Sequence, residues 1–113
     1  MPAQVFVTIS VMLAIELATF SVPAESEHML VSERPSMIAA LKRRFPACQA
    51  AFLTKQDDGT WLDVLVWRSR AEALTAAREI DTVPECAHWF RHISSSGGVR
   101  HVDVHAADWP GGR

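Results

Sequence analysis

Apolar and polar positions alternate strictly along residues 60–67, and this two-residue period predicts a β-strand. One face of that strand is purely aliphatic, with Leu62, Val64 and Val66. The other face carries Trp61, Asp63, Leu65 and Trp67. That second set is too aromatic for a solvated surface and too charged for an ordinary core. We expect a sheet whose aliphatic side packs under helices, and whose mixed side encloses the functional cavity.

A longer alternation occupies the start of the chain, where every second residue from Val5 to Leu17 is aliphatic. This run exceeds the usual strand length of about 5–6 residues. We predict a strand core at 13–22, preceded by an arm or strand extension at 1–12. A signal peptide is not expected because no basic residue precedes Arg34, and a membrane span is not expected because Glu16 interrupts the run.

The rest of the chain divides into helical and extended segments. A helix with Ser21 as its cap is predicted to run from Pro23 to Phe45, and Pro35 should kink or divide it. The predicted elements that follow are a strand at 48–56, a turn at Asp58-Gly59, the strand at 60–67, a helix over 71–80 capped by Ser69, a short helix from Pro84 to about Ile93, a loop at 94–98 and a strand at 99–105.

This order, βαββαβ, predicts a ferredoxin-like α+β fold with a four-stranded antiparallel sheet and helices on one face. The expected domain covers residues 13–107, followed by a flexible tail at 108–113. Because the bare face of the sheet would expose aromatic side chains, we expect two copies to cover it mutually. The result would be a homodimeric α/β barrel.

Composition narrows the possible partners. A length of 113 residues suits a single domain, and a net charge of -2 gives no electrostatic reason to expect binding to nucleic acid. Cys48 and Cys86 are not spaced as a metal or redox motif and read as buried free thiols. We expect a cytoplasmic protein with no membrane or nucleic-acid partner. The surface charge should include His28, Arg34, Lys42, Arg43 and Arg44.

The polar residues on the mixed faces form the predicted site. Glu16, Asp63 and His101 are the candidate catalytic residues, because a histidine beside two carboxylates can exchange protons. The candidate substrate-binding residues are Phe20, Trp61, Trp67 and Asp103. The alternative is that these polar groups only fix the register of a dimer interface. No metal site is predicted, since His88 and His92 lack a third ligand.

The pattern resembles the dimeric α/β-barrel superfamily, and within it the antibiotic biosynthesis monooxygenase-like proteins. The resemblance rests on the element order and on the segments at 15–20, 58–67 and 69–73, followed by Pro84 and Trp89-Phe90. It implies oxidation of a hydrophobic or aromatic substrate without a cofactor, with Trp67 at the family's tryptophan position. Glu16 replaces the asparagine of heme-degrading members, which makes heme a weaker option. The alternative function is a non-catalytic, ligand-binding or stress-associated dimer.

Overall fold

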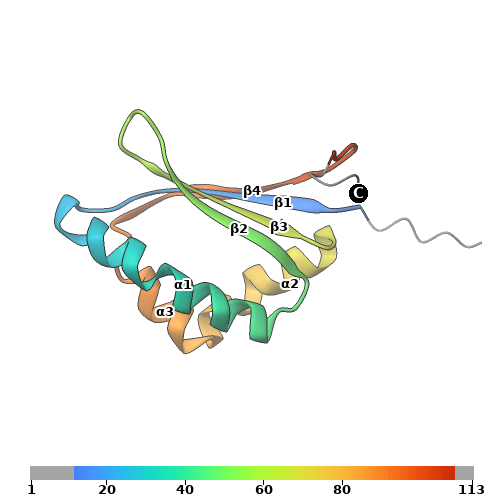
Figure 1. Ribbon diagram of the computed structural model, residues 1–113, viewed down its shortest axis with the longest axis horizontal. Helices are drawn as coiled ribbons and strands as arrows, with labels where there is room; N and C mark the ends of the chain where they lie inside the picture. Colours follow the sequence, from blue (N-terminus) through green and yellow to red (C-terminus); the bar gives the residue numbers. More distant parts are fainter. Residues whose placement is uncertain (1–11, 109–113) are drawn as a thin grey trace, which may run out of the picture.

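The computed structural model describes residues 12–108 and contains one sheet with all its helices on one side (Figure 1). Its elements in chain order are β1 (Ala14–Ser21), η1 (Ala24–Ser26), α1 (Glu27–Arg44), β2 (Cys48–Lys55), β3 (Trp61–Trp67), α2 (Arg70–Glu79), η2 (Ile80–Thr82), α3 (Pro84–Phe90) and β4 (Ser95–Asp103). The ferredoxin-like α+β fold is therefore confirmed. The predicted arm at 1–12 lies outside the described residues except for Met12.

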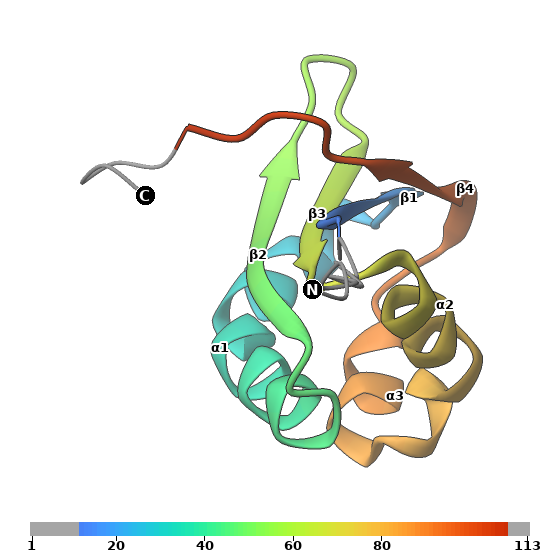
Figure 2. The ribbon, with the colours of Figure 1, turned by 90° about the vertical axis from the view of Figure 1, so that its right-hand side faces the viewer.

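The sheet has four strands in the order β2-β3-β1-β4, and all its pairings are antiparallel. The central strand β1 pairs with β3 on one side and with β4 on the other, both of which come much later in the sequence. Strands β2 and β3 form a hairpin that projects beyond the helices (Figure 2). Its turn uses Gly59 at φ +88°, a conformation that residues with a side chain rarely adopt. The Asp-Gly turn is thus confirmed.

The layers are reversed relative to the sequence prediction. Trp61, Leu65 and Trp67 belong to the buried core together with Leu30 and Leu41 of α1, so the mixed face lies under the helices. The aliphatic face points away from them, and its Phe52 is 56% exposed. Alternation defines two faces but does not say which one the helices cover. The charges on the mixed face have partners inside the chain, which offsets the cost of burying them there.

Three local predictions differ from the structure for identifiable reasons. Pro35 does not divide helix α1, which continues through it as one element; Pro35 is exposed, so the bond it fails to donate lies at the solvated side. Residues 95–98, expected as a loop, begin strand β4. They pair with β1 through a register shift at Thr19/Phe20, and Gly98 adopts φ +105° there. Ser21 ends β1 rather than capping a helix.

The predicted cap of α2 is present. The side chain of Ser69 accepts a hydrogen bond from the backbone N–H of Glu72 at 3.2 Å. Pro84 begins α3, as its fixed φ favours. Among residues 12–108 no helix is long and apolar enough to cross a bilayer.

Candidate functional site

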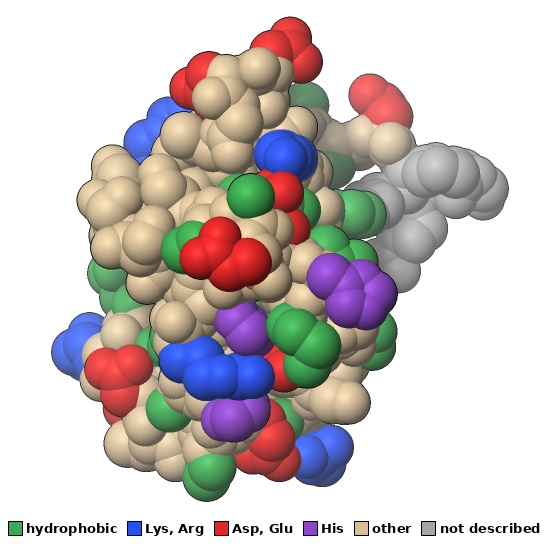
Figure 3. All heavy atoms as spheres, turned by 90° about the vertical axis from the view of Figure 1, so that its left-hand side faces the viewer, with side chains coloured by type: hydrophobic (Ala, Val, Ile, Leu, Met, Phe, Trp, Pro, Cys, Tyr) green, Lys and Arg blue, Asp and Glu red, His purple; other side chains and the backbone are tan. Residues whose placement is uncertain are grey.

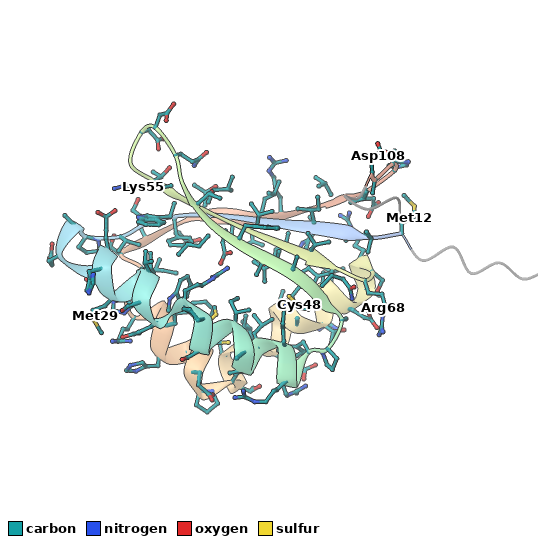
Figure 4. All side chains as sticks on the ribbon, viewed as in Figure 1. Met12, Met29, Cys48, Lys55, Arg68 and Asp108 are labelled. Carbon is teal, nitrogen blue, oxygen red and sulfur yellow. The ribbon has the colours of Figure 1, made fainter. Side chains whose placement is uncertain are left out.

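A cavity of about 220 Å³ lies between the sheet and the helix layer. The sheet contributes Glu16, Phe20, Asp63 and Trp67 to its wall, and the helices contribute mainly apolar side chains such as Met37 and Trp89. Figure 4 shows side chains filling the region between sheet and helices around this space. Glu16 and Asp63 are its ionisable lining residues, so two carboxyl groups face an otherwise mostly apolar chamber.

The cavity reaches the surface between α2 and β4. Its lining residues on those elements include Ser96 and Val99, which are exposed, whereas Trp67 and Trp89 at its inner end are buried. The exposed end of the cavity therefore lies beside the edge strand β4. Figure 3 shows the left-hand side of the molecule as drawn in Figure 1, where acidic, basic and histidine side chains mix without a patch of one sign.

Glu16 and His101 form a hydrogen-bonded pair on adjacent strands. They are direct partners in the β1–β4 register, and His101 Nε2 lies 3.1 Å from Glu16 Oε1. Burial raises the pKa of Glu16, the hydrogen bond and charge of His101 lower it, and nearby Asp63 raises it again. A carboxylate with a raised pKa in an apolar cavity is a suitable proton acceptor.

Asp63 is held by an arginine that the sequence analysis placed on the surface. Arg34 of α1 is only 8% exposed and donates two hydrogen bonds to Asp63, at 2.7 and 2.5 Å. Its guanidinium also lies 5.0 Å from the ring centre of Trp89. The spacing held a signal for this: Arg34 is four residues after Leu30 and three before Met37, within the buried stripe of α1.

Burial and the ion pair act on Asp63 in opposite directions. Desolvation raises the pKa of Asp63, while the hydrogen bonds and charge of Arg34 lower it. Both carboxylate oxygens are engaged by the guanidinium in a bidentate pair. The predicted triad of Glu16, Asp63 and His101 is therefore divided into two pairs, Glu16 with His101 and Asp63 with Arg34.

Trp67 contributes a buried donor with no acceptor. The side chain is 1% exposed and lines the cavity, and its Nε1 is the buried side-chain atom without a hydrogen-bond partner among residues 12–108. The indole lies near enough to Glu16 to lower its pKa slightly, without completing a hydrogen bond. A buried, unpaired N–H costs about 1–3 kcal/mol, which an acceptor on a bound ligand would recover.

Two residues predicted to bind substrate lie elsewhere. The indole of Trp61 donates to Glu27 at 3.1 Å and faces Lys55, whose Nζ is 5.6 Å from the ring centre. Asp103 is exposed and pairs with Arg70 at 3.3 Å. Neither lines the cavity. Alternation placed both on the same face of the sheet as Glu16, but neither side chain reaches the cavity.

His88 in α3 and His92 just after it have no further metal-ligating side chains beside them within residues 12–108. His88 is exposed, while His92 is buried and contacts Glu33 at 3.1 Å. Glu33 also accepts two hydrogen bonds from Arg91, and these bonds hold its pKa at about 2. Within the described residues, no three side chains of His, Cys, Asp or Glu come together in a way that could hold a metal ion. We interpret His92 as part of a polar contact between α1 and the end of α3.

Known structures share this fold, although no family model and no curated protein matches the sequence. A protein of Bordetella bronchiseptica, provisionally assigned as an antibiotic biosynthesis monooxygenase, matches with a TM-score of 0.64 at 13% identity, over 80% of this chain and 95% of its own. A Chloroflexus aurantiacus protein with the same provisional assignment gives a TM-score of 0.60 at 8% identity, over 86% and 97% of the two chains.

A third match has an assigned activity. SnoaB from Streptomyces nogalater, a cofactor-independent oxygenase solved as a mutant, gives a TM-score of 0.57 at 14% identity, over 86% of this chain and 95% of its own. At these identities the likeness concerns the fold. It agrees with the resemblance that the sequence indicated, to the antibiotic biosynthesis monooxygenase-like proteins.

Proposed function

We propose that the protein is a small-molecule enzyme that oxidises a hydrophobic or aromatic substrate in its cavity, without a cofactor. The observation that carries this proposal is the combination of groups at one apolar cavity: a carboxyl group of raised pKa at Glu16, and the unpaired N–H of Trp67. The fold shared with a cofactor-independent oxygenase supports the same reaction class.

Each residue has a role that its surroundings support. Glu16 accepts the proton of a phenolic or enolic hydroxyl, because its raised pKa makes it a more effective base than an ordinary carboxylate. The Trp67 N–H then donates a hydrogen bond to the resulting oxyanion. Phe20 and Trp89, which meet edge to face at 6.0 Å, supply flat walls for an aromatic ring.

The chemistry follows from that deprotonation. An aromatic or enolic anion is electron-rich enough to reduce molecular oxygen, and a new C–O bond forms at the activated carbon. Oxidation of a ring CH₂ to C=O then consumes O₂ and releases H₂O, so no external reductant is required. The apolar cavity favours this sequence, because it excludes water from the anion and its oxygen adduct.

We further propose that a second copy of the chain covers the outward face of the sheet. This face carries Phe52, Val64 and Val102 among its side chains, with Phe52 56% and Val102 36% exposed. Such a contiguous apolar surface is typical of an interface. Cys48 and Cys86 are unpaired and buried, consistent with the reducing cytoplasm that we propose as the compartment.

A substrate screen with matched variants tests the enzyme proposal. Purified protein is mixed with a panel of phenols, naphthols and anthrones while oxygen consumption and ligand binding are followed. Glu16→Gln should abolish oxygen consumption but retain binding, and Trp67→Phe should weaken both. Trp61→Phe is the control, because this tryptophan lies outside the cavity and should behave as wild type.

The outcomes separate the candidate functions. Binding without oxygen consumption by the wild type would favour the non-catalytic ligand-binding protein. Equal effects of Trp61→Phe and Trp67→Phe would contradict the assignment of the cavity as the site. Sedimentation tests the dimer independently: Phe52→Glu should give a monomer if the outward face is the interface.

A further inference from the structure

The position of His101 gives the cavity a polar connection to the protein surface. Glu16 lines the cavity on β1, and His101 is its direct cross-strand partner on β4. Because β4 is an edge strand of the sheet, His101 stands between the cavity carboxyl group and the outside of the molecule. The 3.1 Å separation of His101 Nε2 and Glu16 Oε1 allows direct proton transfer.

The second ring nitrogen of His101 completes the connection. Nδ1 forms no hydrogen bond to the described residues, and it is not among the buried side-chain atoms that lack a partner. The side chain as a whole is 9% exposed. The imidazole thus has one nitrogen on the cavity carboxyl group, and its other nitrogen is not engaged by the described residues.

The remaining ionisable group of the cavity cannot serve as this route. Both oxygens of Asp63 accept hydrogen bonds from Arg34, which carries no proton that it can release near neutral pH. The rest of the described cavity wall is dominated by apolar side chains such as Leu65 and Trp89. A proton taken up by Glu16 therefore has the hydrogen-bonded His101 as its route towards the edge of the sheet.

We propose that His101 relays protons between Glu16 and solvent, so that a hydroxyl proton taken from the ligand leaves the cavity through the edge of the sheet while the ligand fills the opening. This relay rests on the proposed function of Glu16 as the base. The ligand O–H bond breaks and Glu16 gains the proton. Glu16 passes it to Nε2 of neutral His101, whose Nδ1 carries the ring proton at this stage, and the imidazolium then releases its Nδ1 proton to water. This leaves the ring proton on Nε2, and proton exchange with water returns His101 to the Nδ1–H tautomer before the next transfer. Glu16 is a carboxylate again, and no electron changes hands.

The charged surroundings are compatible with such a cycle. Glu16 is faced by Asp63, which Arg34 neutralises, and by His101 itself; the Cys48 thiol on β2 is also close enough to be influenced by Glu16. On the outer side, Arg70 of α2 donates to the backbone oxygen of His101 at 3.4 Å and pairs with Asp103.

Stopped-flow mixing with 4-nitrophenol tests the relay, because its anion is coloured and reports proton removal directly. Wild type, His101→Ala and the control His105→Ala, an exposed histidine beyond β4, are compared with and without added imidazole. The first proton transfer, to Glu16, does not need His101, so His101→Ala should form an initial fraction of the anion at the wild-type rate. Completion requires Glu16 to lose its proton, and this phase should be on the order of 100-fold slower, the usual size of a proton-transfer contribution. Imidazole in solution should restore the rate of this variant and leave the other two unchanged.

The controls separate this relay from the role of Glu16 and from damage to the fold. Glu16→Gln should prevent anion formation at equilibrium, whereas His101→Ala should change its rate and preserve its final extent. A wild-type rate of completion in His101→Ala, or a slow rate that imidazole does not restore, would overturn the relay while leaving Glu16 as the base. Absence of anion formation in wild type would overturn both proposals.

Discussion

The buried ion pair between Arg34 and Asp63 makes a strong prediction about stability. Both residues are below 10% exposure, so replacing Arg34 with Met leaves a carboxylate in the interior without its partner. Removing one member of a buried pair typically costs about 3–5 kcal/mol of unfolding free energy. Loss of the cation–π contact with Trp89 adds to this cost. A domain of ordinary stability, about 5–15 kcal/mol, would lose a large part of its margin.

The matched control lies on the same helix. Arg43 pairs with Glu85 at 3.4 Å, but the two side chains are 68% and 48% exposed. Exposed pairs of this kind contribute about 0–1 kcal/mol, so Arg43→Met should unfold near the wild-type urea concentration. The difference in unfolding free energy between Arg34→Met and Arg43→Met therefore measures how much burial of the ion pair adds to the cost of the same substitution.

The pH dependence gives the assay a second, independent readout. Without Arg34, the two largest causes that lower the pKa of Asp63 are lost while desolvation remains, so its folded pKa rises further above the unfolded value. A raised folded pKa means that the folded state binds more protons, and stability falls as pH increases through that pKa. Arg34→Met should therefore regain stability when urea unfolding is repeated near pH 4, about the ordinary pKa of Asp.

Two results would refute this reasoning. One is equal destabilisation by Arg34→Met and Arg43→Met at neutral pH. The other is a deficit in Arg34→Met that does not shrink in acid. The double variant Arg34→Met/Asp63→Asn should be more stable than Arg34→Met alone at neutral pH, because it removes the buried charge together with its partner.

Two further predictions concern the surface contact of α1 and the strand bulge. Arg91 lowers the pKa of Glu33 to about 2, so the contribution of Glu33 to stability is present above the unfolded value near 4.5 and is lost as pH falls towards 2. Glu33→Gln should therefore flatten the acid limb of stability against pH in thermal melts, and an unchanged acid limb would contradict this. Gly98→Ala should destabilise by about 1 kcal/mol in urea, because φ is +105° while nothing crowds the added Cβ; a neutral effect would contradict the strain.

The sequence predicted the fold well because its periods are local. Alternation at 60–67, the Asp-Gly turn and the Ser69 cap each specify an element from neighbouring residues alone, and the element order then leaves few topologies. The bulge that begins β4 was missed because its pairing with Thr19 and Phe20 depends on a strand far earlier in the chain. Serines and glycines at 95–98 are loop-like by themselves.

The candidate site was harder to predict because the alternation of polar and apolar residues does not show which charged side chains pair with each other. The aliphatic face was assigned to the helices since aliphatic residues usually form cores, yet Arg34 and His101 make the acidic face the better one to bury. Alternation placed Glu16 and Asp63 on one face of the sheet, and both line one cavity, although that cavity lies under the helices rather than on the bare face. Their division into separate pairs depended on a side chain from α1, which no pattern within the strands could indicate.

The two buried cysteines can report how often the structure opens locally. Cys86 is fully buried behind α1, its Sγ near the Met37 carbonyl oxygen, and burial raises its pKa to about 11; the pKa of the buried Cys48 thiol at the start of β2 is raised as well. Thiol reagents react with exposed thiolates, so neither position is modified until its surroundings separate. The labelling rate of Cys86 thus reports how often the helices separate. The labelling rate of Cys48 reports how often the edge strand β2 detaches from the sheet, and neither measurement needs an added probe.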